Sequence, residues 1–169
     1  MIVRLKLLLT LLAFSLIPTL LIWLPFFFRL EKFWGIPLPQ SGMGTIVANY
    51  DGPLYLVVAK TFYSTSLIKQ NFSFPLPVEY YAAHFPLFPA LVRAFSFLTG
   101  FPYAMLLVTL LTSLLAIYYF NKLILMYVKE KDALWLTFIF AILPARWLVV
   151  RSVGSPEPLF VGAIIASIY

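Results

Sequence analysis

The 169-residue chain contains no cysteine, only one histidine and only six acidic residues. The absence of cysteine excludes disulfide bonds and thiolate metal sites. A single histidine without an H-x-x-x-H or H-E-x-x-H pattern gives no basis for a metal site, so we expect neither a metal nor another cofactor. The chain also lacks a Gly-rich phosphate loop and a Ser-His-Asp arrangement, which disfavours nucleotide hydrolysis and serine hydrolase chemistry.

Charge is scarce as well, and apolar side chains take its place. Hydrophobic residues make up 63% of the chain, charged residues 11%, and the mean hydropathy is +0.98. Ordinary soluble domains are about 45–50% apolar and about 25% charged. The 12 basic residues, which give a net charge of +6, are scattered around apolar runs and form no single patch. The composition therefore predicts the lipid bilayer as a partner and no nucleic acid.

Four apolar runs are candidates for crossing a bilayer, at about residues 7–28, 102–128, 133–150 and from 158 onward. Each approaches the roughly 20 residues that a membrane-spanning helix needs. The fold class expected is an all-α integral membrane protein, a polytopic helix bundle. Pro18 should kink the first helix. That first run is longer than the apolar part of a signal peptide, so we expect it to be retained. The last run is still apolar at Tyr169, so we expect the chain to be the N-terminal part of a longer protein.

A segment of about 70 residues, 29–101, separates the first two runs and is rich in proline and aromatic residues. Loops of this length are usually functional. Aromatic rings favour the membrane interface, and two short helices are expected there, at about residues 52–63 and 86–98. Neither is long enough to cross the bilayer.

Basic residues in the short flanks predict the orientation. Arg4 and Lys6 precede the first run, and Lys122, Lys129 and Lys131 lie between the second and third. The positive-inside rule places both flanks on the cytoplasmic side. The long loop and the turn RSVGSPEP then share the opposite side, which brings together Asp51, Glu79, His84, Arg151 and Glu157. We expect a multi-pass protein of the plasma membrane, or of the endoplasmic reticulum in a eukaryote, with an extracytoplasmic site.

The two acids at helix starts each have two interpretations. Asp51 in NYDGPLY fits an N-cap with Pro53 in the first turn, and it also fits a base that takes a proton from an attacking hydroxyl. Glu157 in SPEP fits a dipole-favoured first-turn acid after a capping Ser155, and it also fits a ligand for a sugar hydroxyl. The capping roles are favoured by sequence alone, and both roles can coexist.

Basic residues offer candidates for binding phosphate. A planar guanidinium binds phosphate through two hydrogen bonds, which favours Arg93 and Arg151. Arg146 lies near the outer end of the third run, where an ionisable residue is a functional candidate, although snorkelling to the interface is a simpler explanation. His84 could donate a hydrogen bond to an anionic leaving group, but a structural role is favoured.

Three motifs occur in order along the chain: YDGPLYLVVAKTFY at Tyr50–Tyr63, HFPLFPALVR at His84–Arg93 and SVGSPEPLFVG at Ser152–Gly162. They resemble the W-D-x-x-x-Y-L-x-I-A-x-x-G-Y, F-F-P-L-Y-P-x-L-x-R and S-x-x-Y-S-E-S-L-F patterns of PIG-V-like mannosyltransferases. These enzymes belong to the C-type superfamily (GT-C) of polytopic glycosyltransferases. The resemblance covers about residues 49–162. The chain departs from the patterns at four positions: Tyr50 replaces Trp, Phe62 replaces Gly, and Pro156 and Pro158 replace serines.

The resemblance implies an inverting transfer of mannose or a similar hexose from a polyprenyl-phosphate donor. The acceptor would be a glycan or glycolipid, and the active site would be extracytoplasmic. Asp51 would be the catalytic base, and the substrate-binding residues would be Tyr55, His84, Arg93, Arg151 and Glu157.

Two other classes remain open. The first is a non-catalytic polytopic membrane protein, such as half of a transporter or an assembly subunit. The second is another lipid-processing transferase that depends on His84, for instance an acyltransferase. Substitution of His84, and not of Asp51, would inactivate such an enzyme.

Overall fold

The computed structural model describes residues 2–73, 76–143 and 145–169, with side chains from Leu5 onward. The chain is mostly helical, and the sheet within these ranges is a single short hairpin. Arg4, which was part of the orientation prediction, lies outside the described side chains.

Two helices are long and apolar enough to cross a membrane: α1 (Ile2–Phe27) and α6 (Phe101–Ile124). They correspond to the first two predicted runs. Helix α1 continues through Pro18 and Pro25, which lie inside it. Helix α6 ends at Ile124, a few residues before the predicted end.

The predicted run at residues 133–150 is not one helix. It forms α7 (Glu130–Ile142) and the short α8 (Ala145–Val150). Leu143 is extended, as expected for a residue that precedes a proline, because the proline ring disfavours the α conformation before it. The last run forms α9 (Glu157–Ile168), which starts one residue before the predicted start.

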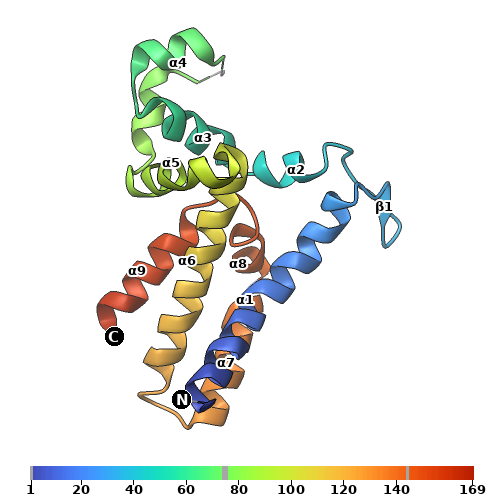
Figure 1. The fold of residues 1–169 in the computed structure, drawn as a ribbon, viewed down its shortest axis with the longest axis vertical. Helices are drawn as coiled ribbons and strands as arrows, with labels where there is room; N and C mark the ends of the chain where they lie inside the picture. Colours follow the sequence, from blue (N-terminus) through green and yellow to red (C-terminus); the bar gives the residue numbers. More distant parts are fainter. Residues whose placement is uncertain (1, 74–75, 144) are drawn as a thin grey trace.

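Figure 1 shows α6 at the centre of the molecule. It contacts α1, α7 and α9 along its length and the short helices at its start. Gly162 of α9 packs closely on the α6 backbone, because a Cβ placed there would lie 3.3 Å from Cα of Ala116. Small residues thus allow the two helices to approach closely.

The long segment after α1 forms a layer of short elements over one end of the bundle (Figure 1). It contains the hairpin β1 (Lys32–Phe33) and β2 (Ile36–Pro37), α2 (Met43–Val47), α3 (Gly52–Thr61), α4 (Thr65–Asn71), the 3₁₀ helix η1 (Val78–Ala83) and α5 (Leu87–Thr99). The two short helices expected from sequence correspond to α3 and α5. The others were not predicted.

Two apolar clusters hold this layer together. In one, α3, α5 and α6 pack through Ala59, Phe88, Val92 and Met105. In the other, α3 packs against α4 and η1 through Val58, Ile68 and Tyr81. The layer is therefore fixed on the start of α6, and it places the N-terminus of α3 beside the turn that leads into α9.

Candidate functional site

A polar recess lies where the start of α3, the start of α8 and the turn before α9 meet. Its cavity is about 120 Å³ and brings together two acids that are far apart in the sequence, Asp51 and Glu157. The lining residues are Tyr50, Asp51, Tyr55, Arg146, Gly154, Ser155, Pro156 and Glu157.

An apolar groove adjoins the recess. Its volume is about 500 Å³, and its lining is almost entirely hydrophobic. Tyr55, Pro156 and Glu157 line both spaces, so the recess and the groove share a wall. The remaining groove residues come from α5, from the residue two positions before it and from α9: Phe85, Leu87, Phe88, Leu159, Phe160 and Ala163.

Asp51 occupies the N-cap position of α3, with Pro53 in the first turn, as expected from sequence. Its side chain makes no capping hydrogen bond. The carboxylate is exposed at the recess. Because the cap interaction is not made, both carboxylate oxygens can accept hydrogen bonds from a bound molecule.

Glu157 begins α9 and is fixed by its neighbour Ser155. The Ser155 hydroxyl donates a hydrogen bond to Oε2 of Glu157, and the Glu157 N–H lies 3.4 Å from the same hydroxyl oxygen. Ser155 is itself held by Thr109 of α6, whose hydroxyl donates to the Ser155 carbonyl (3.1 Å) and accepts from the Ser155 N–H (3.1 Å). The Glu157 carboxylate is therefore oriented by a chain of contacts that begins in the buried core.

Two glycines allow the walls of the recess to meet over one methionine. A Cβ on Gly154 would lie 2.1 Å from Cε of Met105, and a Cβ on Gly52 would lie 3.3 Å from the same atom. The Gly52 Cβ would also lie 2.3 Å from the backbone oxygen of Val47. Met105, fully buried in α6, thus lies beneath both walls.

Tyr55 stands at the junction of the recess and the groove. Burial, reinforced by the negative charges of Glu157 and Asp51, raises the pKa of Tyr55 to about 12. Its hydroxyl therefore stays protonated near neutral pH and can donate a hydrogen bond.

The ring of Tyr55 packs edge-on against His84 (centroids 4.7 Å apart) and Phe88 (5.1 Å). His84 is 4% exposed, and its Nδ1 has no hydrogen-bond partner among the described residues. Its backbone carbonyl accepts a hydrogen bond from the Tyr63 hydroxyl. The structure thus places His84 behind Tyr55 and outside the recess lining.

The two arginines expected to hold phosphate bind backbone carbonyls instead. Nη1 of Arg93 donates to the carbonyls of Ala59 (3.2 Å) and Lys60 (3.1 Å), in the last turn of α3. Arg151 is 0% exposed. Neither lines the recess, so we do not assign either as a ligand of phosphate there.

Arg151 binds backbone carbonyls of two helices, and two of these carbonyls lack their usual helical partner. Pro18 has no N–H, so the carbonyl of Phe14 lacks its usual partner within α1. Nη2 of Arg151 donates to that carbonyl (3.2 Å), and Nη1 donates to the carbonyl of Ser15 (3.0 Å). Nε donates to the carbonyl of Ala141 (2.9 Å) in the last turn of α7, where helical partners also run out. The guanidinium thus joins α1 and α7 directly before the turn that carries Ser155.

Arg146 is the cation that sequence reasoning did not assign to the site. It is exposed in α8 and lines the recess with the two acids. Its position as an ionisable residue in an apolar run was the available signal. The break of the helix before α8 brings it to the recess.

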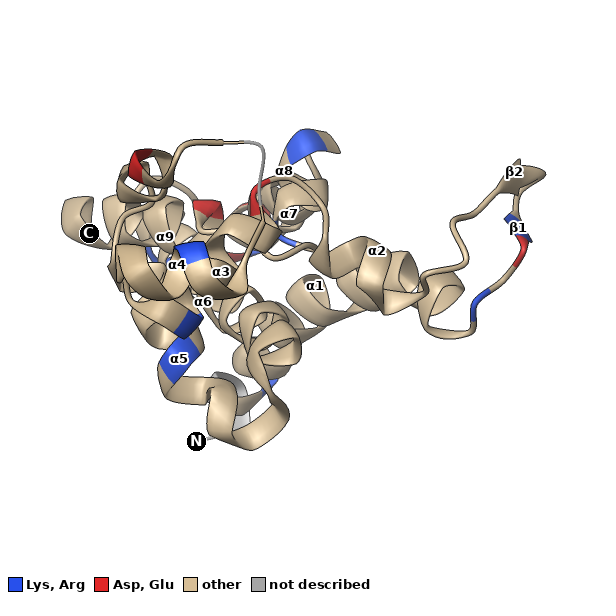
Figure 2. Cartoon of the chain, turned by 90° about the horizontal axis from the view of Figure 1, so that it is seen from above, with Lys and Arg blue, Asp and Glu red and all other residues tan. Residues whose placement is uncertain are grey.

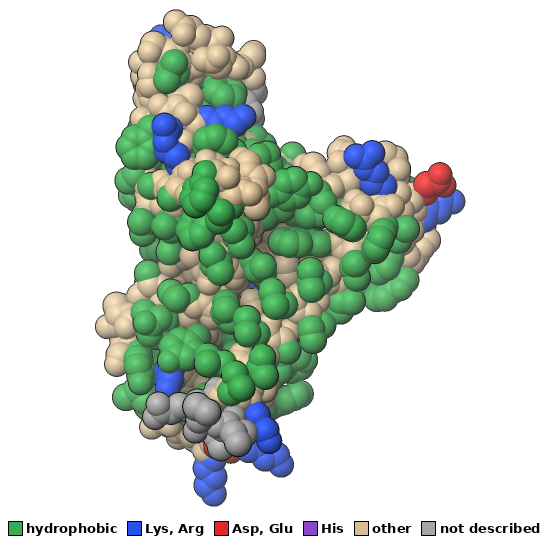
Figure 3. All heavy atoms as spheres, in the orientation of Figure 1, with side chains coloured by type: hydrophobic (Ala, Val, Ile, Leu, Met, Phe, Trp, Pro, Cys, Tyr) green, Lys and Arg blue, Asp and Glu red, His purple; other side chains and the backbone are tan. Residues whose placement is uncertain are grey.

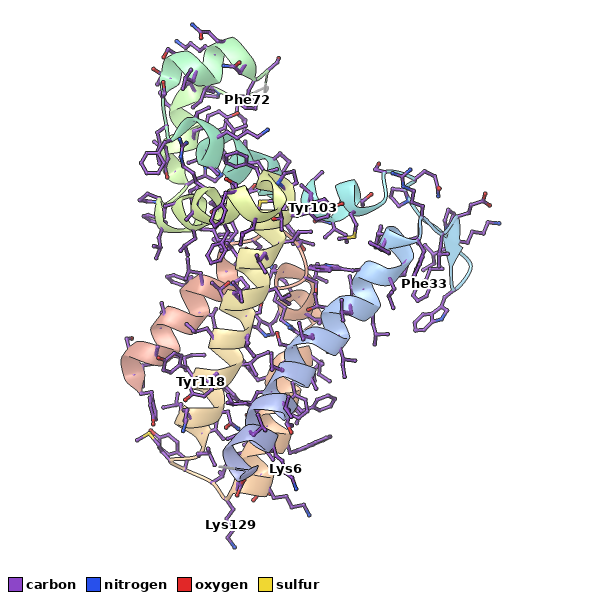
Figure 4. All side chains as sticks on the ribbon, in the orientation of Figure 1. Lys6, Phe33, Phe72, Tyr103, Tyr118 and Lys129 are labelled. Atoms are coloured by element: carbon purple, nitrogen blue, oxygen red, sulfur yellow. The ribbon has the colours of Figure 1, made fainter. Side chains whose placement is uncertain are left out.

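The recess, with its two acids, lies at one end of the bundle, and lysines lie at the opposite end. Lys6 and Lys129 lie together there, far from the layer formed by α3 and α5 (Figure 4). Figure 2, which views the layer from above, shows only scattered charged positions. Among the described residues, no cluster of three or more potential metal ligands is present.

Comparisons of the chain with protein-family models, with curated proteins and with solved structures found no match.

Proposed function

We propose that this chain carries the donor site of a membrane-embedded glycosyltransferase, which moves a hexose from a polyprenyl phosphate to a hydroxyl acceptor. The observation that carries the proposal is the shared wall of the recess and the groove. A polyprenyl-phosphate sugar has a polar head and a long apolar tail, and this pair of spaces offers an acidic, cation-containing recess next to an apolar groove. The resemblance of the three motifs to GT-C enzymes supports the same conclusion.

A location in the membrane is part of the proposal. Helix α1 is apolar over most of its length, yet many of its large side chains are exposed, among them Leu9, Leu21 and Phe27. Figure 3 shows hydrophobic side chains covering much of the visible bundle surface. Such a surface would be costly in water and is favourable in lipid. Lysines at the end opposite the recess agree with an extracytoplasmic site.

Asp51 is the proposed base. Its carboxylate would accept the proton of the acceptor hydroxyl while that oxygen forms a bond to the anomeric carbon of the sugar. The bond between the anomeric carbon and the phosphate oxygen would break on the opposite face, which inverts the configuration. The released polyprenyl phosphate would keep the bonding electrons.

Arg146 is the proposed partner of that phosphate. A guanidinium stabilises the charge that develops on a leaving phosphate, and Arg146 is the cationic side chain that lines the recess. Glu157 would accept hydrogen bonds from sugar hydroxyls, held in place by Ser155. Tyr55 would donate to the head group at the mouth of the groove, and His84 would support the Tyr55 ring.

The test is hexose transfer by the full chain in membranes, with a radiolabelled polyprenyl-phosphate hexose as donor. We expect Asp51→Asn to reduce transfer by about 10²–10⁴-fold, the usual contribution of a general base. Glu79→Gln, at an exposed acid of η1 outside the recess, is the matched control and should retain activity. An active Asp51→Asn enzyme would remove Asp51 from the base role. Inactivation by His84→Ala alone would favour the acyltransferase alternative. Transport of a solute without any sugar transfer would favour a non-catalytic protein.

Whether Asp51 and Glu157 lie on the same side of the membrane can be tested separately, because the chain contains no cysteine. Single cysteines at Asp51, Glu157 and Lys131 can be probed in intact cells with a membrane-impermeant maleimide. We expect positions 51 and 157 to react from outside and position 131 to remain unlabelled. Reaction of 51 and 157 from opposite sides would exclude a common site.

A further inference from the structure

A short arm projects from the end of α1, and neither the recess nor the groove involves it. The arm comprises residues 28–40 and contains the β1–β2 hairpin, in which Lys32 pairs with Pro37 and Phe33 with Ile36. Figures 1 and 2 both show it pointing away from the helices. Trp34, at the tip, is 90% exposed, and Ile36 is 66% exposed.

The arm has a defined fold. The Leu38 N–H donates to the Glu31 carbonyl (2.9 Å), and Nε2 of Gln40 donates to the carbonyls of Leu38 (3.0 Å) and Leu30 (3.4 Å) at the base of the hairpin. These contacts hold the two sides of the arm together at its base.

The tip presents a tryptophan in an unfavourable backbone conformation. Trp34 has φ 48° and Gly35 has φ 78°, the pattern of a tight two-residue hairpin turn. Positive φ is uncommon for a bulky residue, and such strain points to a functional reason for the side chain. The Trp34 ring stacks on Phe33, with centroids 5.1 Å apart, and this enlarges the apolar tip.

The arm is also two-sided. Arg29, Glu31 and Lys32 are exposed beside the apolar tip. In Figure 3 the charged atoms lie along the upper edge of the arm and hydrophobic atoms along its lower edge, which continues into the apolar surface of the bundle. Figure 1 shows the arm turned back, so that its tip lies level with the last turns of α1.

We propose that the arm is an interfacial anchor, with its aromatic tip inserted between the lipid headgroups and acyl chains of the outer leaflet. This inference rests on the membrane location proposed above. Tryptophan favours that layer because its ring is apolar and its N–H can bond to water or headgroups. The charged edge, with both signs of charge, would remain among the headgroups. The continuity of the lower edge with the exposed surface of α1 favours lipid over a protein partner.

The test places an environment-sensitive NBD label on a cysteine at either of two positions in the same arm. Ile36→Cys reports the apolar edge, and Glu31→Cys is the matched control on the charged edge. The labelled full chain is reconstituted in vesicles of phosphatidylcholine and phosphatidylglycerol. Quenching by lipids with a doxyl group near the headgroup is compared with quenching by aqueous iodide.

We expect the label at position 36 to have blue-shifted emission, to be quenched by the doxyl lipid and to resist iodide. The label at position 31 should show the reverse. Adding Trp34→Ala should restore iodide quenching at position 36, because the anchor would be lost. Two outcomes would overturn the proposal. The first is iodide quenching of the label at position 36 in the protein that retains Trp34. The second is protection of that label from both quenchers, which would mean that protein covers the tip.

The readout is independent of sugar transfer. If the label at position 36 is open to iodide while Asp51→Asn abolishes transfer, the anchor fails and the proposed function stands. If carbonate extracts the whole chain from membranes, the membrane location fails together with both proposals.

Discussion

The two walls of the recess are built in different ways. The wall that carries Glu157 is held by hydrogen bonds: Arg151 to α1 and α7, Nε1 of Trp23 to the Ser152 carbonyl (2.6 Å), and Thr109 to Ser155. The wall that carries Asp51 is held by close packing of Gly52 against Val47, and its carboxylate makes no capping hydrogen bond. An acid that binds a sugar benefits from a fixed orientation, whereas a base must meet a mobile hydroxyl. The difference therefore matches the roles proposed for the two acids.

The largest effect should come from breaking the hydrogen-bonded wall. Arg151→Met removes donors from three carbonyls, two of them in buried contacts, so we expect a loss of about 3–5 kcal/mol of unfolding free energy. Denaturant titration in detergent micelles measures it. Arg29→Met, at an exposed arginine outside both walls, is the control and should change stability little. A stable Arg151→Met protein would show that the wall does not depend on this residue.

Each wall contains one glycine, and the two glycines differ in the atoms that an added methyl group would meet. Gly52→Ala would press a methyl against the Val47 backbone, whereas Gly154→Ala would meet the flexible end of Met105. We expect each to cost about 1–3 kcal/mol, the usual range for overpacking. Met105→Ala should rescue Gly154→Ala and leave Gly52→Ala unstable. Thermal unfolding of the single and double variants checks this, and rescue of both would mean that both walls rest on Met105 alone.

A smaller effect should reveal the link between Arg151 and Pro18. Pro18→Ala restores an N–H that can bond to the Phe14 carbonyl, so a guanidinium is needed less. In a double-mutant cycle with Arg151→Lys, we expect a coupling of about 1 kcal/mol, the net value of one hydrogen bond. Pro25→Ala, at the other proline of α1, is the control. Additive effects of Pro18→Ala and Arg151→Lys would contradict the assignment.

The last effect is absent at neutral pH and concerns Tyr55, which lines both the recess and the groove. Its pKa is raised from 10 to about 12 in the folded protein, so between these pH values the unfolded chain loses its proton first. Stability should therefore be insensitive to this group below pH 10 and should fall as the pH rises toward 12. Tyr55→Phe should remove that part of the alkaline loss, which unfolding titrations at several pH values can measure. An identical pH dependence in both proteins would contradict the shift.

Sequence reasoning anticipated that Asp51 and Glu157 lie close together, but it did not anticipate the partners of the arginines. Asp51 and Glu157 could be placed on one side because the positions of the apolar runs determine which turns share a face. The starts of α3 and α9 followed from their proline and acid signals. The hydrogen-bond partners of Arg93 and Arg151 could not be predicted from the sequence. A proline in α1 leaves a carbonyl unpaired, but only the tertiary packing shows which distant side chain reaches it. The position of Arg146 at the recess also depends on tertiary structure, because it follows from the break between α7 and α8.

The hairpin arm escaped prediction for a different cause. Its strands have two residues each, too few for an alternating pattern to be visible. The turn residues Trp34 and Gly35 are also not a pair typical of such turns, which favour Asn-Gly or Asp-Gly.

The buried guanidinium of Arg151 also has a consequence for the order of assembly. Its partners lie on α1 and α7, which precede it in the chain, so they are synthesised before it. In the proposed membrane location, a charged side chain left without partners in hydrocarbon would be costly. The turn that follows α8 can therefore settle only after α1 is in place to receive it. Biogenesis of the recess would then proceed from α1 toward α9, and a chain with α1 exchanged for an unrelated apolar helix should insert but fail to mature.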